Sequence, residues 1–558
     1  MSMLKRLENF LVSIFAEDVP LKQTTPIWQL IAGIGVLVYC GLHIYAGLEN
    51  HMDIQFADEA AYLRFGLDLP GHLNRDWGPL YAIWYKLLSF FTTDTIKLYY
   101  LNFRLTAIIP PILLLLFLWR MGVNFILAFF ISYCVLVSEA NISVWPRVSQ
   151  FCIILLLSGL ILSTYFKNKF YKLLLLTLVT LLCSYARPEF YLAFILLLFI
   201  TILLGFYQPI TFNKKTTGWI IFYVIIIASL HLFFRFPSNN FFGFNRGVAA
   251  FYQHYAFNLR IQHKLDVDAW LGWEDLAKST FGNCNSMLCV IINQPKIFIL
   301  NTLFNIKNYI AFTFVSVGSY LFPLVLFHSN KIKFLIAFSS YIGLILLLIN
   351  KTTRNKIKTQ FSHYIFYILF LLVFISPTIL SCVFVFPREH YIYLQMLFFV
   401  LIIISILNPL LPEKINVKAI LLGLFLICLC VCPSYSKYPF LKMDSANAKL
   451  CNKKMIRLLQ QNYNDKPHTI FTNMPFVRGM LPENFHEVNT IFDKKKLIPY
   501  AHYADSAKID IVIVNASLLR DPHIIYDSTW ISFFNNPTAR GFKPLHFSEC
   551  ETYLLIKE

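Results

Sequence analysis

Five acidic residues fall close together in the first long hydrophilic stretch of the chain, residues 48–97. Two of them, Asp58 and Glu59, are adjacent in an Ala-Asp-Glu-Ala-Ala-Tyr motif, and the others are Asp53, Asp68 and Asp76. A carboxylate in such a pair can take a proton from a hydroxyl group as that hydroxyl attacks another molecule. The alternative is that a solvated loop simply carries acids, because carboxylates are most stable in water.

A second group of candidate residues is basic. A guanidinium group forms paired hydrogen bonds with phosphate oxygens, so arginines at the edge of an apolar segment are candidates for binding a phosphate. Such candidates are Arg147, Arg187, Arg388 and His390, with Arg75 as a weaker one. The alternative is that they are interfacial anchors whose charged ends extend to lipid head groups.

Long apolar blocks must position these residues. Of the 558 residues, 57% are hydrophobic and only 14% are charged, whereas about a quarter of a soluble chain is charged. The apolar runs approach or exceed the ~20 residues that cross a bilayer as a helix. We expect twelve such blocks, at residues 27–47, 98–119, 122–138, 149–166, 171–186, 188–207, 218–236, 308–328, 332–350, 361–386, 391–408 and 416–433.

Lysines and arginines in the short loops predict the orientation of these blocks. Basic residues precede the first block and recur in later loops at Arg120, Lys167, Lys169, Lys172, Lys214, Lys215, Lys331, Lys333, Lys351, Arg354, Lys356, Lys358, Lys414 and Lys418. Between residues 95 and 434, every acid except Glu413 falls in the opposite loops. The sequence therefore predicts a cytoplasmic amino terminus, with 48–97, 237–307 and 434–558 outside.

The number of crossings does not follow directly from the twelve blocks. Twelve full crossings would return the carboxy terminus to the inside, and the cluster Lys351–Lys358 alternates wrongly if both 308–328 and 332–350 span. Either one of these two blocks is re-entrant or interfacial, or a crossing near 285–305 is missing. We therefore predict a polytopic α-helical membrane protein with an odd number of transmembrane helices, in the range of eleven to thirteen.

The formal net charge of +18 does not indicate a nucleic-acid partner, because the basic residues lie in short loops and form no single basic face. Residues 1–19 are amphipathic and mixed in charge, which predicts a helix on the inner membrane surface. The segment Asp268–Ser279, with Trp270, Leu271 and Trp273, predicts a second amphipathic helix on the outer surface.

The tail, residues 434–558, differs in kind from residues 1–433. It holds 12 of the 30 acids and alternates helical and strand-like patterns, which predicts a small soluble α/β domain. The pattern favours a helix near Ala446–Gln461 and strands near His468–Thr472, Ile509–Asn515, Phe542–Phe547 and Thr552–Ile556. Four cysteines lie in the segments placed outside, and the pairs Cys284–Cys289 and Cys451–Cys550 could form disulfides there.

The order of these features resembles the GT-C superfamily of membrane glycosyltransferases, which includes the protein O-mannosyltransferases and the lipid A aminoarabinose transferases. The resemblance runs along most of the chain. Asp58-Glu59 lies in the first outer loop, Pro79-Leu80-Tyr81 follows some twenty residues later, and a long apolar span comes next. Ala186-Arg187-Pro188-Glu189 separates two apolar blocks, and Pro387-Arg388-Glu389-His390-Tyr391 precedes a late one. The large outer loops and the soluble outer tail belong to the same pattern.

The resemblance implies an enzyme in a bacterial inner (plasma) membrane that transfers a sugar from a polyprenyl-phosphate donor to a hydroxyl group. The acceptor would be an envelope lipid, a glycan or a protein, and displacement from the opposite face would invert the sugar. Asp58 would be the catalytic base, with Glu59 positioning the acceptor or assisting. Arg388, and after it Arg187, His390 and Arg147, would bind the donor phosphate.

The resemblance leaves cofactors open. No cofactor is certain, but a divalent metal is possible, and His254 and His263 could help to bind one. Asp266-Val267-Asp268 matches the Asp-x-Asp motif of other glycosyltransferases, but no nucleotide-binding βαβ unit precedes it, and such short matches are common.

Two other kinds of protein have to be considered. A multi-spanning transporter or lipid or glycan flippase would need ionisable residues or broken helices near the middle of the membrane. Here the charges stand at block ends and no inverted repeat is visible. An O-antigen polymerase or ligase is disfavoured by the early Asp58-Glu59 loop and by the long soluble tail.

Overall fold

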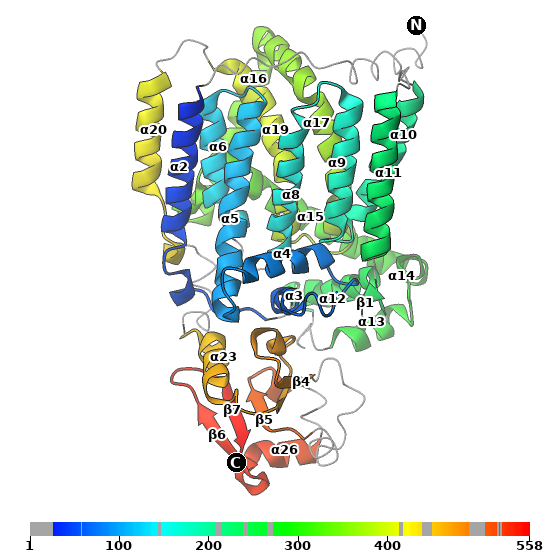
Figure 1. Ribbon diagram of the computed structural model, residues 1–558, viewed down its shortest axis with the longest axis vertical. Helices are drawn as coiled ribbons and strands as arrows, with labels where there is room; N and C mark the ends of the chain where they lie inside the picture. The colour runs from blue at the N-terminus through cyan, green and yellow to red at the C-terminus, as the bar shows by residue number, and fades with distance from the viewer. Residues whose placement is uncertain are drawn as a thin grey trace.

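The computed structural model describes residues 26–56, 58–142, 147–207, 214–237, 240–241, 244–264, 272–327, 329–411, 417–437, 449–489, 508–521, 524 and 527–558. The described chain is mostly helical and ends in a small domain that contains a five-stranded sheet. Figure 1 shows this domain below a body of upright helices. The predicted helix at residues 1–19 lies outside the described residues.

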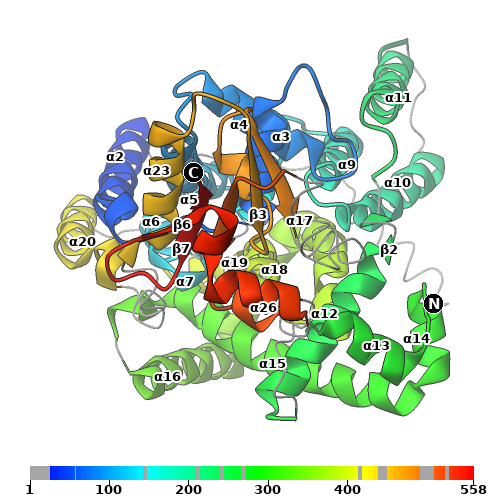
Figure 2. The ribbon, with the colours of Figure 1, turned by 90° about the horizontal axis from the view of Figure 1, so that it is seen from below.

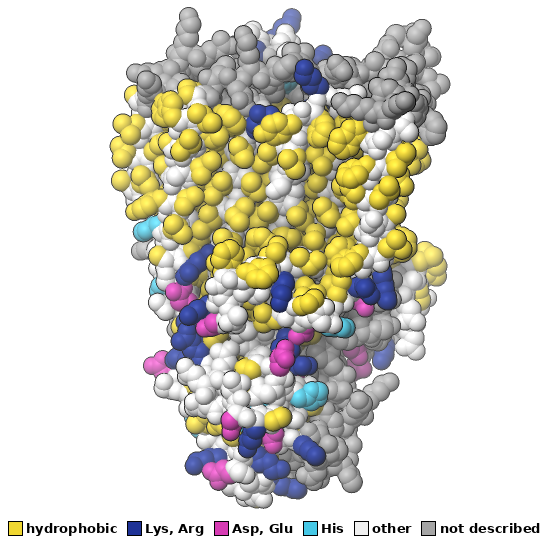
Figure 3. Space-filling view, in the orientation of Figure 1, with side chains coloured by type: hydrophobic (Ala, Val, Ile, Leu, Met, Phe, Trp, Pro, Cys, Tyr) yellow, Lys and Arg dark blue, Asp and Glu magenta, His cyan; other side chains and the backbone are white. Residues whose placement is uncertain are grey.

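Long apolar helices form the body. They are α2 (Ile27–Ile44), α5 (Thr95–Arg120), α6 (Phe125–Val137), α8 (Val148–Ser163), α9 (Lys169–Ser184), α10 (Phe190–Tyr207), α11 (Lys214–Phe234), α15 (Pro295–Leu321), α16 (Asn330–Ile349), α17 (Lys351–Phe384), α19 (Met396–Leu407) and α20 (Val417–Val431). Among the described helices, five are long and apolar enough to cross a membrane. A sixth would result if the pair α14 (Met287–Asn293) and α15, bent by 114°, were one span. Figure 3 shows their hydrophobic side chains as a continuous band, with charged side chains below it.

Polar caps define where several of these helices begin. Asn124, Asn168 and Asn350 precede α6, α9 and α17, and each side chain accepts a hydrogen bond from a backbone N–H in the first turn. Asp94 does the same for α5. Such caps satisfy donors that have no partner inside the helix, which contributes about 1 kcal/mol each. The helix α17 therefore begins after Asn350, ten residues before the predicted block 361–386.

One part of the predicted charge pattern is wrong. Lys333, at the start of α16, forms a salt bridge with Glu139 of α7 (Glu139–Ile142) and is only 6% exposed. The prediction placed Lys331 and Lys333 with the other basic clusters, on the side opposite Glu139. The salt bridge places Lys333 on the same side as Glu139, because two side chains in direct contact cannot lie on opposite faces of a bilayer whose core is ~30 Å thick.

Short elements gather at the lower ends of the upright helices, where α4 lies across them (Figure 1). They are η1 (Leu48–Asn50), α3 (Asp58–Leu67), α4 (Pro79–Ser89), β1 (Asn240–Phe241), β2 (Phe244–Asn245), α12 (Arg246–Ile261), α13 (Trp273–Phe281), α14 and α18 (Glu389–Leu394). Three further short helices connect longer ones: η2 (Leu324–Leu326), η3 (Asn408–Leu410) and η4 (Tyr435–Lys437).

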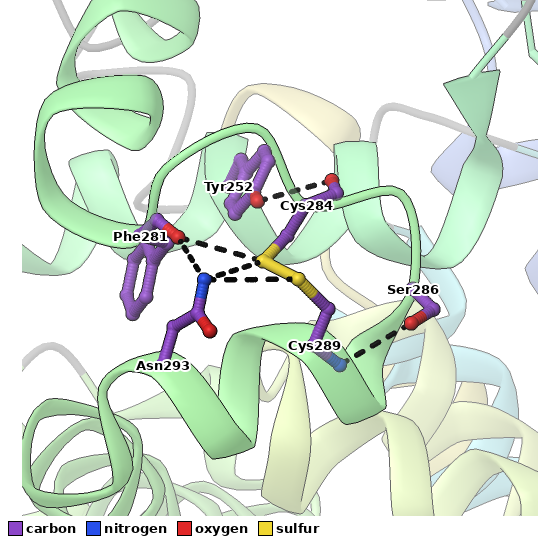
Figure 4. The surroundings of a disulfide bond; sticks show 6 residues. All are labelled: Tyr252, Phe281, Cys284, Ser286, Cys289 and Asn293. Carbon is purple, nitrogen blue, oxygen red and sulfur yellow. Dashed lines mark hydrogen bonds between the residues drawn. A yellow bond between two sulfur atoms is a disulfide. The ribbon is translucent and has the colours of Figure 1, made fainter.

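The predicted amphipathic helix at Asp268–Ser279 is present as α13, which begins at Trp273. Trp273 is buried in a cluster with Phe251 and Phe281 instead of lying at a surface, and Trp270 lies outside the described residues. The disulfide Cys284–Cys289 joins the end of this helix to α14. In Figure 4, Tyr252 donates to the Cys284 carbonyl on one side of the disulfide, at 3.3 Å. The first predicted disulfide is thus present.

The C-terminal domain contains the predicted helix and strands. Its sheet has the order β4-β3-β5-β7-β6, with β3 parallel to β4 and β5, and β7 antiparallel to β5 and β6. The elements are α23 (Cys451–Asn462), β3 (His468–Thr472), η5 (Val477–Met480), β4 (Phe485–Asn489), β5 (Ile511–Val514), η7 (Leu518–Arg520), α26 (Ser528–Asn535), η8 (Pro537–Arg540), β6 (Phe542–His546) and β7 (Tyr553–Lys557). The second predicted disulfide, Cys451–Cys550, joins α23 to the β6–β7 turn.

Asp53 connects this domain to the helical body. Its carboxylate accepts the backbone N–H groups of Asn452 at 2.8 Å and Lys453 at 2.9 Å, in the first turn of α23. A carboxylate from the first loop thus caps a helix of the tail, where the helix dipole favours negative charge. Seen from below in Figure 2, the domain lies in front of the central helices, with α10 and α11 at the periphery.

Candidate active site

Asp58 is the first residue of α3 and is partly exposed. Two arginines from distant segments lie near it. Burial lowers the pKa of Arg388, and the negative charge of Asp58 opposes this effect. Burial would also lower the pKa of Arg246, the first residue of α12, but Tyr62, Glu189 and Asp58 raise it overall. Asp58 and Arg388 therefore belong to one cluster of charges, although most of the chain separates them.

Arg388 is held by a histidine that the sequence analysis considered only for a metal. Its Nε donates to Nε2 of His254 at 2.9 Å, and its Nη2 contacts the same nitrogen. The other ring nitrogen, Nδ1, lies 2.6 Å from the Ala250 carbonyl, which can only accept. His254 must then carry its proton on Nδ1 and be neutral. Burial and the charge of Arg388 hold the pKa of His254 well below its usual value, which agrees with this state.

His390 lies two residues after Arg388, on α18, and is 5% exposed. Its Nε2 is buried and has no hydrogen-bond partner among the described residues. Burial, together with the charges of Arg187 and Arg388, holds the pKa of His390 well below its usual value. A buried imidazole nitrogen without a partner is costly, so this atom is a candidate to contact a ligand.

Arg187 joins the cluster from the turn between α9 and α10. Its Nε forms a 2.6 Å ion pair with Glu189, and Nη1 donates to Ser149 at 2.8 Å. Its guanidinium also lies over the ring of Tyr391, 4.9 Å from the centroid. The Arg-Pro-Glu and Arg-Glu-His-Tyr motifs of the sequence thus meet in space. Together they supply positive charge beside Asp58.

Glu59 is placed differently from its neighbour Asp58. It is 1% exposed, and its Oε1 accepts from Tyr81 at 2.6 Å, Tyr85 at 2.5 Å and Asn102 at 2.9 Å. Its Oε2 accepts from the backbone N–H of Arg147 at 3.0 Å. Burial raises the pKa of Glu59 although these bonds act against it. Both oxygens are occupied by protein donors, so the geometry gives Glu59 a positioning role.

Arg147 belongs to the same buried layer. Its side chain is 1% exposed, donates to Thr106 at 3.0 Å and to the Asn141 carbonyl at 2.8 Å, and lies over the ring of Phe103. These contacts tie α8 to α5 and fix the backbone that binds Glu59. Of the predicted residues, the structure brings Asp58, Arg187, Arg388 and His390 into one cluster. Glu59 and Arg147 contact each other in the buried layer beside this cluster.

The turn before α4 packs against the cluster. Gly78 has φ +53, a region that glycine adopts without strain, and a Cβ there would lie 2.6 Å from Tyr62 and 3.0 Å from the Ala186 carbonyl. The preceding Trp77 contacts Tyr62, and the guanidinium of Arg246 lies 5.8 Å from its ring centroid. The weaker candidate Arg75 lies apart, since its Nε donates to the Phe233 carbonyl.

Sequence reasoning missed Arg246, Glu189 as an ion-pair partner, and His254 as a partner of Arg388. Arg246 and His254 lie in the hydrophilic stretch 237–307, where neither belongs to a motif that the sequence analysis considered. Among the described residues, no group of three or more His, Cys, Asp or Glu side chains could hold a metal ion. Asp266 and Asp268 lie outside the described residues. No family model matches the chain, and no curated protein matches its sequence.

Proposed function

We propose that this protein is a membrane glycosyltransferase that moves a sugar from a polyprenyl-phosphate donor to a hydroxyl acceptor. The observation that supports it is the cluster in which the carboxylate of Asp58 interacts with the charge of Arg388, and Arg388 in turn acts together with Arg187 on His390. These residues come from three segments, namely the start of α3, the turn between α9 and α10, and the start of α18. A lipid-linked donor would need this arrangement, because its hydrocarbon tail stays in the bilayer while its phosphate reaches the edge of the membrane.

The membrane topology that fits this proposal has eleven crossings. They are made by α2, α5, α6, α8, α9, α10, α11, α16, α17, α19 and α20, with an inside amino terminus and with 48–97, 237–307 and 434–558 outside. The helix α15 would not cross. Asn301 and Asn305 of α15 accept from Asn258 of α12 in an outer loop, and Lys333 just after α15 pairs with Glu139 on the same side. The prediction left open whether block 308–328 or 332–350 is interfacial, and this topology selects the first.

The sidedness has independent support from cysteine chemistry. Both disulfides of the described chain, Cys284–Cys289 and Cys451–Cys550, lie in segments proposed to be outside. Disulfides persist in oxidising compartments such as the bacterial periplasm and not in the cytosol. The proposed location is therefore a bacterial inner membrane with the cluster on its outer face.

In the proposed reaction, Asp58 takes the proton of the acceptor hydroxyl while the hydroxyl oxygen bonds to the anomeric carbon of the donor. The bond from that carbon to the phosphate oxygen breaks, and its electron pair remains on the lipid phosphate. Attack from the opposite face inverts the anomeric centre. Arg388 and Arg187 stabilise the negative charge that develops on the phosphate.

Neutral His390 has a separate role in this scheme. Its Nε2 can carry a proton and donate one hydrogen bond to a phosphate oxygen, which would supply the partner that this buried atom lacks within the protein. Glu59 and Arg147 act at a distance from the reaction, by fixing the backbone on either side of Asp58.

A transporter or flippase is the alternative function. It would need ionisable side chains near the membrane midplane. The clustered charges here, Asp58, Arg187, Arg388 and Arg246, instead lie at or beyond the ends of apolar helices on one side. That placement favours surface chemistry over passage through the bilayer.

Mass spectrometry of envelope lipids and glycans tests the proposal. A strain without the gene should lack one sugar modification. Plasmid-borne wild-type protein should restore it, and Asp58→Asn at equal membrane abundance should not. An unchanged set of glycans and lipids in the deletion strain, or full restoration by Asp58→Asn, would contradict the proposal.

A further inference from the structure

One turn of the C-terminal domain lies against the helix that carries Asp58. Gly479 in η5 packs so tightly on α3 that a Cβ at this position would lie 2.3 Å from the Ala60 carbonyl oxygen. The Met480 carbonyl accepts from Thr95 at 2.7 Å and from Gln460 at 2.8 Å. This turn, residues 476–480, is thus anchored both on the helical body and on its own domain.

Phe476, the first residue of this turn, has an unusual backbone. Its φ is +62 and its ψ is 30, the left-handed region that residues with a side chain rarely adopt. Glu487 of β4 maintains it, because Oε1 accepts from the Phe476 N–H at 3.1 Å and Oε2 from the Arg478 N–H at 2.8 Å. A strained residue persists only where the surroundings fix it, and such residues concentrate at functional sites.

The side chain of Phe476 connects this strained turn to the charged cluster. Its ring meets Trp77 edge to face, with centroids 5.4 Å apart. Trp77 in turn lies under the guanidinium of Arg246 and contacts Tyr62. Contacts therefore run continuously from Glu487, through the turn and Trp77, to Tyr62 and Arg246. Both of these residues interact with the charge of Asp58.

We propose that Phe476 is a positioning residue, and that the turn 476–480 sets the place of α3 and Trp77 and hence of Asp58 relative to Arg246. The C-terminal domain is then a part of the active site and not a separate module. Its role in sugar transfer rests on the proposed function, whereas its hold on α3 does not.

Phe476→Gly separates positioning from stability. Glycine adopts a positive φ without strain, and this gain offsets part of the loss of the partly buried ring. The variant should therefore remain folded with a modestly lower melting temperature, while the contact with Trp77 is lost. Amide hydrogen exchange in α3 and around Trp77 should become faster, with β3 unchanged. The kcat for sugar transfer should fall about 10- to 100-fold, as for a misplaced catalytic group, with the donor KM unchanged.

Three further variants serve as controls. Phe476→Tyr keeps the ring and should restore both kcat and slow exchange in α3. Glu487→Gln removes one of two acceptors and should show a weaker form of the Phe476→Gly effect. Glu549→Gly removes the same kind of strain, since Glu549 has φ +69, at an exposed turn away from Trp77, and should change neither measurement.

The outcomes are decisive in either case. Unchanged exchange in α3 in Phe476→Gly would overturn the proposal, as would faster exchange with an unchanged kcat. If the wild type transfers no sugar at all, the proposed function fails, while faster exchange in α3 would still establish the hold of this turn on α3.

Discussion

The backbone N–H of Arg147 donates to Oε2 of Glu59 at 3.0 Å, which joins the start of α8 to the first turn of α3. Glu59→Gln should therefore act on stability more than on chemistry. In this variant an N–H₂ group replaces one carboxylate oxygen, although the protein places only hydrogen-bond donors around that position. One buried donor then loses its acceptor, which costs about 1–3 kcal/mol of folding free energy. We expect a lower melting temperature in detergent, with residual transfer activity in proportion to the folded fraction. A fully folded but inactive variant would assign Glu59 to the chemistry instead.

Arg388 and His254 should behave as a coupled pair. Arg388→Ala removes a phosphate ligand and should raise the donor KM at least about 10-fold while leaving the acceptor KM unchanged. His254→Ala frees the Arg388 side chain and should raise the donor KM by a smaller factor. In the double variant the two effects should not add, because contacting residues typically couple by 0.5–3 kcal/mol. Additive effects on donor KM, measured in a full double-mutant cycle, would contradict the pairing.

Acid should destabilise the cluster through His390. Its folded-state pKa lies well below the usual value of 6.5, because of burial and the charges of Arg187 and Arg388. Between pH 6.5 and that lower pKa, the unfolded chain binds more protons than the folded chain, so stability falls as pH falls. His390→Gln should flatten this part of the curve of melting temperature against pH. His263→Gln, which changes a histidine outside the cluster, is the matched control and should leave the curve as in the wild type.

Asp53 should control how firmly the C-terminal domain docks. Asp53→Asn keeps the shape but removes the charge at the first turn of α23, and Asp53→Ala removes the cap altogether. Loss of a helix cap costs about 0.5–2 kcal/mol, so amide hydrogen exchange in α23 should be faster in the alanine variant. Equal exchange in wild type and Asp53→Ala would show that other contacts, such as the 2.9 Å hydrogen bond from Gln460 to Thr95, suffice for docking.

The sequence predicted those parts of the fold that depend on local patterns. Apolar blocks and strand alternation located most helices of the body and four of the five strands of the C-terminal sheet. The fifth, β4, was missed because Phe485–Asn489 carries polar residues on both sides of Val488 and pairs at the edge of the sheet. Local patterns also proposed both disulfides.

Features that depend on distant contacts were not predictable in this way. Lys333 was assigned to the wrong side because its partner, Glu139, lies far away in the sequence. Asp58 and Glu59 look equivalent as sequence neighbours. In the structure, however, Asp58 is partly exposed, whereas Glu59 accepts hydrogen bonds from four protein donors. Arg246 belongs to no motif that the sequence analysis considered, and only the fold brings it to Asp58 and Trp77.

Asp58→Asn tests the central claim most directly. The purified variant, in detergent or vesicles with a polyprenyl-phosphate sugar and the acceptor identified in the envelope, should bind donor with the wild-type affinity but transfer sugar at least about 100-fold more slowly, since the base is lost. Its melting temperature should match the wild type, because Asp58 is partly exposed. Transfer at the wild-type rate by the folded variant would contradict the assignment of Asp58 as the base.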